Sequence, residues 1–144
     1  MMEPHFRSEE WVAGKLVEVN IRPTRQRVRI GQILWRKEHR HVTAERVYME
    51  CQGLGERVSL ATVYNTLHQF RSAGLLREVL VNGNCVYCDT NVTPHHHFYN
   101  EETGELYDIP HQHMQLSALP TPPLGTMVSG VDVVVRIKPS TGAA

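Results

Sequence analysis

Apolar residues recur at helical spacing in four stretches of the first half of the chain. Each stretch follows a Ser or Thr whose hydroxyl can accept a hydrogen bond from the first helical turn, which marks where a helix begins. The pattern is clearest in the fourth stretch, where Leu60, Val63 and Leu67 fall on one face and Gly74 ends the pattern. The four stretches predict helices over about 9–19, 24–37, 43–53 and 59–74.

Strand-forming runs replace this pattern in the second half. Two of them flank Asn82-Gly83-Asn84, a strong signal for a tight hairpin. A second hairpin is predicted over 95–110, with residues 101–104 as its turn. After it we expect a short helix over 110–119, a Pro-rich connector over 119–125, a strand over 131–138 and a frayed tail.

This order of elements predicts an α+β chain of two lobes. Helices followed by a hairpin are the arrangement of a winged helix-turn-helix, so residues 1–90 are expected to form a DNA-binding domain. Residues 91–94 are the expected hinge, residues 95–138 a C-terminal α/β lobe, and residues 139–144 a flexible tail.

The composition excludes several classes of protein. The 144 residues are 41% hydrophobic and 21% charged, which is typical of a globular chain and not of a disordered one. No apolar run approaches the roughly 20 residues of a membrane-spanning helix, and the N-terminus lacks an apolar signal segment. Three cysteines are too few for a disulfide scaffold. We therefore expect a cytoplasmic protein with free thiols and no membrane association.

The formal net charge is zero, but the charges are unevenly divided. Residues 1–81 hold 13 Lys and Arg against 9 Asp and Glu, whereas residues 82–144 hold 2 against 6. The chain also has nine histidines, three of them adjacent. A basic first half favours a polyanionic partner and an acidic, His-rich second half favours a cation, although ordinary scatter also produces a difference of this size.

The fourth predicted helix is the candidate DNA-recognition helix. Its outward residues are small or polar and include no acid, so they suit close approach to bases and phosphates in a major groove. Arginines before and at the start of the second helix would contact the DNA backbone or the minor groove, and the hairpin tip 82–84 would be the wing. The alternative is a helical lobe with a solvated polar face. The expected DNA contacts are Arg22, Arg25, Arg27, Ser59, Ala61, Thr62, Tyr64 and Asn65, with Thr66 and Gln69 on the same outward face.

Three adjacent histidines open the second predicted hairpin. Side chains alternate along a strand, so His95 and His97 share one face and His96 points to the other. A turn at 101–104 places His97 opposite Asp108, with Cβ atoms about 5 Å apart. His95, His97 and Asp108 are therefore expected to converge.

Two more oxygen or nitrogen donors complete the candidate metal site. Asp89 ends the first hairpin six residues before His95, and a turn at Pro94 would bring the two together. His41 lies in the connector before the third helix. Imidazole and carboxylate ligands suit Fe²⁺, Mn²⁺ or Zn²⁺ and not a soft thiolate site. Ligands from both lobes would couple metal occupancy to the angle between the lobes.

Other residues of metal-binding type give weaker signals. Cys85 and Cys88 form a single CxxC, and without a second pair they cannot build a four-cysteine zinc site, so we interpret them as packing residues of the wing. His111 and His113 fit either a solvated helix face or an auxiliary site with His96. A metalloenzyme is the rival function, but the sequence has no HExxH motif and no nucleophile–base set.

Over about residues 20–138 the chain resembles the ferric uptake regulator family. The resemblance lies in five motifs in order and spacing: Arg22-Pro-Thr-Arg-Gln-Arg, His41-Val-Thr-Ala-Glu, Ser59-Leu-Ala-Thr-Val-Tyr-Asn-Thr-Leu, His95-His-His and Gly104-Glu-Leu-Tyr-Asp108. Within that family, the stretches that begin at Asp89, Pro94 and Val131 are similar to the iron response regulators of alphaproteobacteria.

The resemblance implies a homodimeric transcription factor that binds a double-stranded DNA operator, with a C-terminal lobe that senses metal or haem and dimerises. It further implies control of iron homeostasis and haem biosynthesis genes, with Tyr64 and its helix facing the major groove. A peroxide, zinc or manganese sensor of the same family is the alternative. The implied metal ligands are His41, Asp89, His95, His97 and Asp108, and the implied haem ligands are His95, His96 and His97.

The chain departs from the family pattern in three places. The first cysteine pair of the family's structural zinc site would fall at Asn100 and Thr103, and no cysteine follows Cys88, so we expect no structural four-cysteine zinc. A carboxylate usual at a third metal site falls near Gln115. No cysteine is followed by proline, so haem ligation is expected to use histidine.

Overall fold

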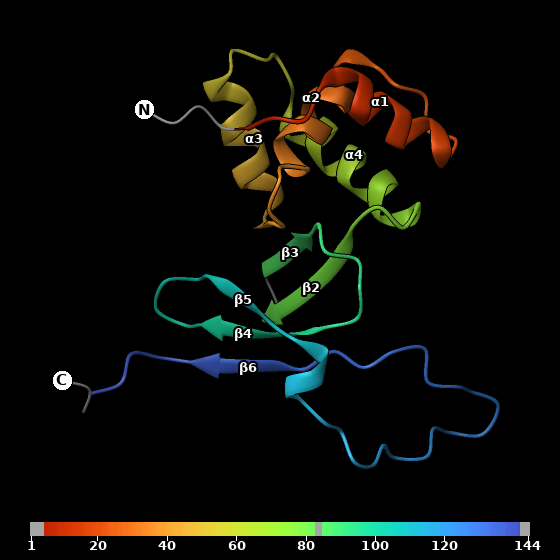
Figure 1. The fold of residues 1–144 in the computed structure, drawn as a ribbon, viewed down its shortest axis with the longest axis vertical. Helices are drawn as coiled ribbons and strands as arrows, with labels where there is room; N and C mark the ends of the chain where they lie inside the picture. The colour runs from red at the N-terminus through yellow and green to blue at the C-terminus, as the bar shows by residue number, and fades with distance from the viewer. Residues whose placement is uncertain (1–4, 83–84, 142–144) are drawn as a thin grey trace. The chain divides into compact units, whose positions relative to one another are not determined.

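The computed structural model describes residues 5–82 and 85–141, which form two compact units that divide between Val92 and Thr93 (Figure 1). Helix and sheet are mixed, as the sequence predicts, with the helices in the first unit. That unit holds α1 (Glu9–Glu18), α2 (Arg25–Leu34), β1 (His41–Val42), α3 (Ala44–Gly53), α4 (Leu60–Ser72), β2 (Arg77–Asn82) and β3 (Cys85–Asp89). The second unit holds β4 (His96–Asn100), β5 (Leu106–Ile109), the short 3-10 helix η1 (His111–His113) and β6 (Val134–Ile137). Among the described helices, none has the length and apolar character that crossing a membrane requires.

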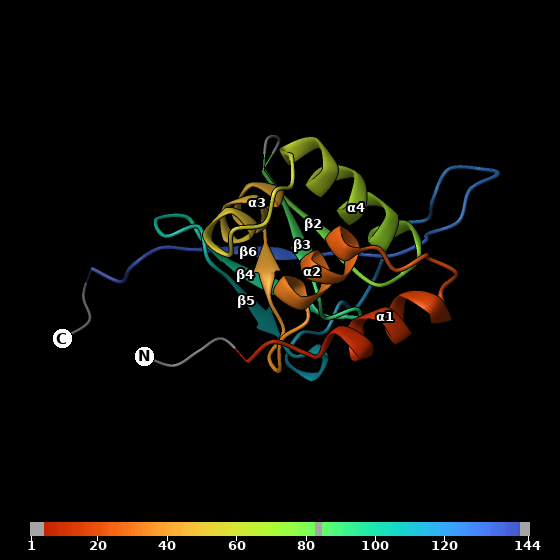
Figure 2. The same ribbon diagram turned by 90° about the horizontal axis from the view of Figure 1, so that it is seen from above.

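The four helices begin where the sequence predicts. The hydroxyls of Ser8, Thr24, Thr43 and Ser59 each accept a hydrogen bond from the backbone N–H three residues further on. α2 contacts the other three helices, which surround it in Figure 2. Gly74, with φ of 80°, follows the end of α4 in the left-handed conformation.

A single apolar core joins these helices. Gly31 allows α1 to approach α2 closely, because a Cβ at that position would overlap the side chains of Val12 and Trp35. The ring of Trp35 stacks on that of Phe70, with centroids 5.1 Å apart. Burying a side chain of this size contributes about 1.5–3 kcal/mol. The fully buried core residues are Val12, Leu16, Ile30, Ile33, Leu34, Val47, Cys51, Val63 and Phe70.

α2 ends three residues earlier than predicted. Trp35 leaves the helical conformation and is buried in the core. Arg36 then lies outside the helix, where its guanidinium pairs with Glu50 of α3 at 2.8 Å. The apolar pattern predicted Trp35 inside the helix. A buried apolar residue just after a helix end cannot be told in the sequence from one on the buried face of the helix.

The connector before α3 contains a strand that the sequence did not predict. β1 pairs with β3, so the first sheet has the order β1-β3-β2. Two hydrogen bonds flank this pairing: the Thr90 N–H donates to the Arg40 carbonyl at 3.0 Å, and the Arg40 N–H donates to Thr90 Oγ1 at 2.8 Å. The β2–β3 hairpin is present as predicted, but residues 83–84 of its expected wing tip lie outside the described residues.

The second sheet confirms the predicted hairpin register. β4 and β5 are antiparallel with His97 opposite Asp108, and the Asn100 N–H donates to the Glu105 carbonyl at 2.9 Å. β6 runs parallel to β4 and gives the order β5-β4-β6.

The helix predicted over 110–119 is wrong. Only the three residues of η1 are helical, and Met114 is already extended. The six residues from Met114 to Leu119 lie between η1 and Pro120, and so short a helix is marginal unless one face is buried. Leu116 and Leu119 are exposed, so no such burial supports it.

Candidate metal centre and DNA-binding face

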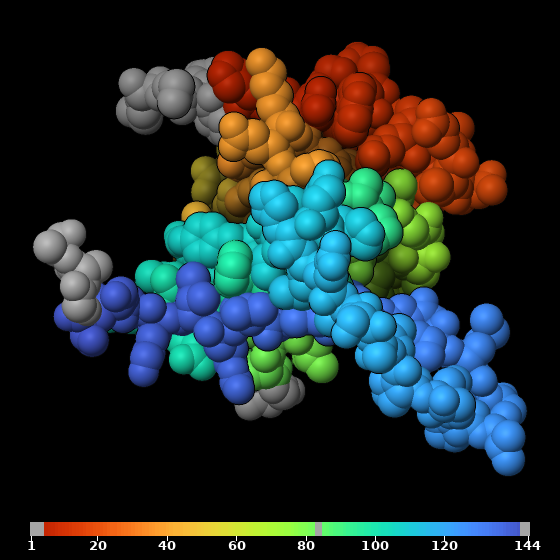
Figure 3. All heavy atoms as spheres, turned by 60° about the horizontal axis from the view of Figure 1, so that its bottom comes forward, coloured from red at the N-terminus to blue at the C-terminus, as the bar shows by residue number. Residues whose placement is uncertain are grey.

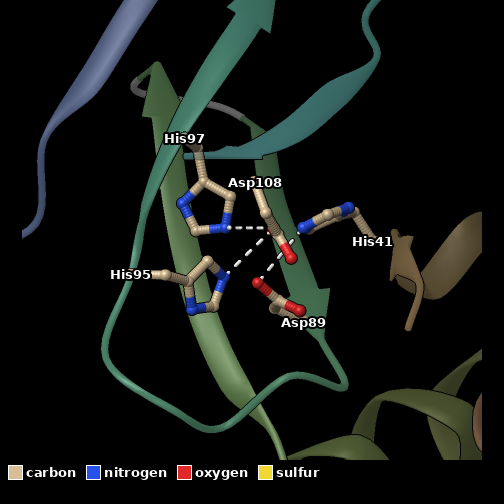
Figure 4. Close-up of side chains that lie close together, drawn as sticks. All are labelled: His41, Asp89, His95, His97 and Asp108. Carbon is tan, nitrogen blue, oxygen red and sulfur yellow. Dashed lines mark ion pairs between the residues drawn. The ribbon is translucent and has the colours of Figure 1, made fainter. Parts of the chain in front are cut away.

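His95, His97 and Asp108 form a cluster on the second sheet (Figure 4). The Nε2 atoms of His95 and His97 lie 3.1 and 3.4 Å from the same oxygen, Asp108 Oδ1, and the ring centroids are 4.4 Å apart. The two histidines are 5% and 2% exposed, whereas Asp108 is partly open to solvent. One ligand atom from each residue lies within 4.8 Å of the others, which suits a single ion with donors at about 2.0–2.2 Å.

The orientation of His95 is fixed by the backbone. Its Nδ1 lies 2.5 Å from the carbonyl oxygen of Thr93, a contact that requires the Nδ1 proton. In a neutral ring Nε2 then has a lone pair, and this lone pair points at the Asp108 carboxylate. That contact is favourable only with a second proton or a bound cation. Two positively charged imidazoles side by side would repel each other, so one divalent ion is the better partner for the two rings and the carboxylate. A histidine whose ring is oriented by a backbone carbonyl is also typical of metal sites.

His41 and Asp89 form a second pair of donors, on the first sheet. They are directly opposite each other in the β1–β3 pairing, and His41 Nε2 lies 3.2 Å from Asp89 Oδ2 (Figure 4). Asp89 is fully buried, and its other oxygen accepts a hydrogen bond from the Asn91 N–H at 2.8 Å. Burying a carboxylate is costly unless it is paired or bound to a metal. The unpredicted strand β1 is what brings His41 to this carboxylate.

His96 lies on the opposite face of β4 from His95 and His97. Its Nδ1 accepts a hydrogen bond from the Val133 N–H at 3.1 Å, which identifies this nitrogen as the unprotonated one. The three histidines implied as haem ligands therefore do not converge on one point. His96 lines an open hollow of about 490 Å³ together with His111, Gln112, Met114, Gln115, Leu116 and Ser117.

Both cysteines of the CxxC lie on β3 of the β2–β3 hairpin. Cys88 packs against the core of the first unit, and burial raises the pKa of its thiol to about 11. Cys85 lines a hollow of about 290 Å³ that also borders Tyr64 and Arg71 of α4. Among the described residues, neither cysteine belongs to a cluster of three or more potential metal ligands.

The residues predicted on the outward face of α4 reach the surface, except for one. Ala61, Tyr64, Asn65 and Gln69 are exposed. Thr66 is only 4% exposed, so its prediction as an outward residue is wrong. At 100° per residue Thr66 falls close to the buried face of the helix. Ser59 uses its hydroxyl to cap the helix and to contact Thr62 at 2.9 Å.

The predicted arginines differ in their surroundings. Arg27 and the N-terminal end of α2 line a polar hollow of about 170 Å³ with Thr24, Gln26, Thr62, Asn65, Thr66 and Gln69, and this hollow has no acidic residue. The Arg27 guanidinium also donates to the Arg22 carbonyl at 2.8 Å, which holds it there. Arg25 instead lies 3.6 Å from Glu56. The hollow adds Gln26 to the candidate DNA contacts, a residue that the sequence did not distinguish.

Tyr64 is held by a residue of another helix. Its hydroxyl donates a hydrogen bond to Glu45 of α3. This carboxylate raises the pKa of Tyr64, because it stabilises the protonated phenol. Glu45 gives no signal in the sequence, because composition does not show which acids lie near the candidate DNA-binding face.

Comparisons with known proteins identify chains of similar sequence. A family model described as the ferric uptake regulator family matches residues 18–118. The ferric uptake regulation protein of Pseudomonas aeruginosa is 38% identical over 97 residues, which are 67% of this chain and 72% of that protein. The peroxide-responsive repressor PerR of Staphylococcus aureus is 32% identical over 111 residues, which are 77% of this chain and 72% of that repressor.

Solved structures show the same fold. The ferric uptake regulator of Vibrio cholerae superposes with a TM-score of 0.68 at 21% identity, covering 88% of this chain and 98% of that one. The ferric uptake regulator of Pseudomonas aeruginosa with manganese superposes with a TM-score of 0.64 at 26% identity, covering 89% and 97%.

Proposed function

We propose, from the premise that this chain belongs to the ferric uptake regulator family of metal-responsive transcription regulators, that one divalent ion bound by both units controls its affinity for an operator. The observation that carries the proposal is the convergence of His95 and His97 on one oxygen of Asp108. The orientation of the His95 ring by the Thr93 carbonyl supports a metal at that point and not a simple ion pair.

Each unit offers an incomplete set of ligands. The second unit supplies two imidazoles and one carboxylate, and the first unit supplies the pair His41 and Asp89. Five residues, 90–94, join Asp89 to His95, so their Cα atoms are six steps and at most about 22 Å apart. We propose that both sets bind the same ion, with residues 91–94 as the hinge. Metal binding would then favour the hinge conformations in which both units share the ion. This is a population shift, because these conformations have the higher affinity for the metal.

The DNA contacts follow from the family and from the polar face of α4. Regulators of this family bind DNA and act as dimers. We propose that α4 enters the major groove of each half-site of an inverted repeat, with Tyr64 and Asn65 at base edges. Arg27, Gln26 and the N-terminus of α2 would contact phosphates, so affinity should fall with salt concentration.

We propose iron as the physiological signal. Imidazole and carboxylate donors suit Fe²⁺, Mn²⁺ and Zn²⁺ alike, and the sequence stretches similar to iron response regulators favour iron among them. A solved relative from Francisella tularensis is described with iron. At the positions where the family's structural zinc ligands would fall, hydrogen bonds hold the β4–β5 turn: Asn100 Oδ1 accepts from the N–H groups of Glu102 and Thr103 at 2.9 and 3.2 Å.

We also propose that haem is a second effector. Of the three implied ligands, His96 fits best, because its ring borders the open hollow of about 490 Å³, whereas His95 and His97 are buried against Asp108. Bound haem would supply an iron that takes an imidazole ligand. A Soret titration tests this: His96→Ala should abolish the absorbance change, whereas His95→Ala with His97→Ala should retain it.

A peroxide-responsive regulator is the second candidate. It is favoured by the 32% identity to a peroxide-responsive repressor and by a ligand set of nitrogen and oxygen alone. Peroxide added to the Fe²⁺ form would then oxidise a ligating histidine, which mass spectrometry detects, and would release the operator. Oxidation that depends on Fe²⁺ and spares the Mn²⁺ form would favour this candidate.

The central test is operator binding by the metal-free chain during titration with Fe²⁺, Mn²⁺ and Zn²⁺, read by fluorescence anisotropy. Asp108→Asn should abolish the metal-dependent rise in affinity, since it removes the shared carboxylate. Glu102→Gln is the matched control, because Glu102 is an exposed acid of the same unit, on the β4–β5 turn. An Asp108→Asn protein with an undiminished metal response would refute the proposed site.

A further inference from the structure

Glu45 is an acid beside the face of α4 that we propose for DNA. It follows the cap residue Thr43 by two positions in α3, and its side chain is exposed. Helices α3 and α4 are in contact (Figure 2), and the Tyr64 hydroxyl of α4 donates a hydrogen bond to the Glu45 carboxylate. A negative charge near DNA phosphates is repulsive, so Glu45 weakens binding unless it contributes to recognition of the bases.

No cation neutralises Glu45 within the described part of the chain. Arg46, the next residue of α3, lies 3.6 Å from Glu50 instead. Arg71 borders the same hollow of about 290 Å³ as Glu45, but its guanidinium pairs with Glu78 of β2. The phenol hydroxyl is therefore the group that stabilises this carboxylate, and the hydrogen bond between them is a strong, charge-assisted one.

This hydrogen bond determines what the Tyr64 hydroxyl can do toward DNA. A phenol has one proton to donate and lone pairs that accept. The proton is committed to Glu45, and the raised pKa of Tyr64 keeps it in place at neutral pH. Toward a base the oxygen can then only accept, and it accepts more strongly, because hydrogen bonds in a chain polarise one another. Tyr64 is 48% exposed and is the fifth residue of α4, near the end of a recognition helix that contacts base edges.

The major groove presents donors and acceptors on opposite strands of each base pair. Adenine N6 and cytosine N4 are amino groups that donate, whereas thymine O4 and guanine O6 and N7 only accept. Every base pair thus has one amino base and one keto base. A protein group that can only accept distinguishes which strand carries the amino base, and inverting the base pair removes the contact.

We propose that Tyr64 and Glu45 together recognise an amino base of the operator, adenine or cytosine, and that Glu45 is the specificity-determining residue of this contact. The inference rests on the proposed placement of α4 in the major groove and names the bases that it selects there. Without Glu45 the hydroxyl of Tyr64 rotates and donates equally well to thymine O4 or guanine O6, so the preference is lost. A purely structural role of Glu45, as an acid in the first turn of α3, predicts instead an equal loss of affinity for all operators.

Inversion of single base pairs is the first test. The full chain with Mn²⁺ selects duplexes from a random library, and each base pair of the selected operator is then inverted in turn. Fluorescence anisotropy at fixed salt gives the ratio of dissociation constants for the inverted and the selected duplex. Where the two residues bind, inversion should raise the dissociation constant of wild type about tenfold, within the usual range for one wrong base pair. Glu45→Ala should reduce this ratio to about twofold and tighten binding to the inverted duplex.

A double-mutant cycle shows whether the two residues act together. Tyr64→Phe removes the hydroxyl and keeps the ring, so the base pair at which it lowers the ratio is the one that Tyr64 contacts. In the Tyr64→Phe protein, Glu45→Ala should change the ratio by less than about twofold, because no phenol proton remains to be held. Glu10→Ala is the matched control and should leave the ratio at its wild-type value. Glu10 is an exposed acid that follows the cap residue Ser8 by two positions in α1, which is the red helix at the surface in Figure 3.

Base analogues identify the group that is recognised. Purine in place of adenine, or pyrimidin-2-one in place of cytosine, removes the amino group from the contacted base. Wild type should lose about tenfold more affinity than Tyr64→Phe on this exchange, since weaker base pairing affects both proteins alike. An equal loss in the two proteins overturns the inference.

The outcomes separate this inference from the proposed function. If Glu45→Ala weakens binding to selected and inverted duplexes by the same factor, or if no base pair shows a preference that depends on Tyr64, the inference is overturned and metal-dependent operator binding stands. If wild type with Mn²⁺ selects no duplex at all, the proposed function itself is contradicted. A preference that requires both side chains and the amino group supports the inference.

Discussion

Thr90→Val is expected to destabilise the first unit although it changes no charge and almost no volume. Thr90 is 8% exposed, and its Oγ1 accepts the backbone N–H of Arg40 at 2.8 Å. Valine keeps the branched shape that strands favour but cannot accept this bond. A buried N–H left without its acceptor costs about 1–3 kcal/mol.

Both tryptophans, Trp11 and Trp35, lie in the first unit, so their fluorescence reports its unfolding in urea. With a slope of about 1–3 kcal/mol per molar urea, a loss of about 2 kcal/mol lowers the midpoint by roughly 1 M. Ser72→Ala is the control, because it removes an exposed hydroxyl of α4, and a surface change of this kind stays within about 0.5 kcal/mol.

The same substitution should also weaken metal binding. Arg40 directly precedes His41, and the Arg40–Thr90 bonds hold β1 against β3 where His41 meets Asp89. If about 1.4 kcal/mol of the loss falls on the His41 position, metal affinity decreases about tenfold. Equal urea midpoints for Thr90→Val and wild type, with equal hydrogen-exchange protection of the Arg40 amide, would refute this reasoning.

Three further predictions concern single side chains. Glu45→Ala should lower the pKa of Tyr64 toward its ordinary value of 10.0, since it removes the acceptor that stabilises the phenol; an NMR titration of the tyrosine ring checks this. Burial raises the pKa of Cys51 and Cys88 to about 11 from 9.0. The stability contributed by these two thiols is therefore complete below pH 9 and is lost as pH rises toward 11. Urea midpoints of Cys88→Ala should decline less over this pH range than those of wild type. Asn100→Ala removes two backbone contacts of the β4–β5 turn and should cost about 1 kcal/mol; an undiminished midpoint measured by far-UV circular dichroism would contradict the turn's role.

Local signals in the sequence determined the parts of the fold that were predicted correctly. A hairpin turn fixes the register of its strands, so a turn at residues 101–104 was enough to place His97 opposite Asp108. Cap residues likewise located the starts of all four helices, because the capping bond spans three residues. These features depend on neighbours in the sequence.

Features set by distant contacts were not predictable. β1 is two residues long and exists only because β3 pairs with it, so nothing in the sequence around His41 indicates a strand. The hydrogen bond from Tyr64 to Glu45 joins residues of two helices that are 19 positions apart in the sequence. The helix predicted over 110–119 is the opposite case, because local signals predicted an element that is not formed beyond residues 111–113. Residues with helical propensity are extended there, since no surface buries one face of them.

The segment that joins the two units also orients the ligands of both. Within the first unit, Asn91 donates to Asp89 and Thr90 is bonded to the residue before His41. Within the second unit, the Thr93 carbonyl orients the ring of His95. A change in the backbone angles of residues 90–93 would therefore alter ligand directions in each unit, as well as the angle between the units. In the proposed site, where both units bind one ion, metal affinity and hinge conformation are coupled through these backbone hydrogen bonds. Such coupling is reciprocal, so operator DNA that favours one hinge conformation should tighten metal binding by the same factor by which metal tightens DNA binding.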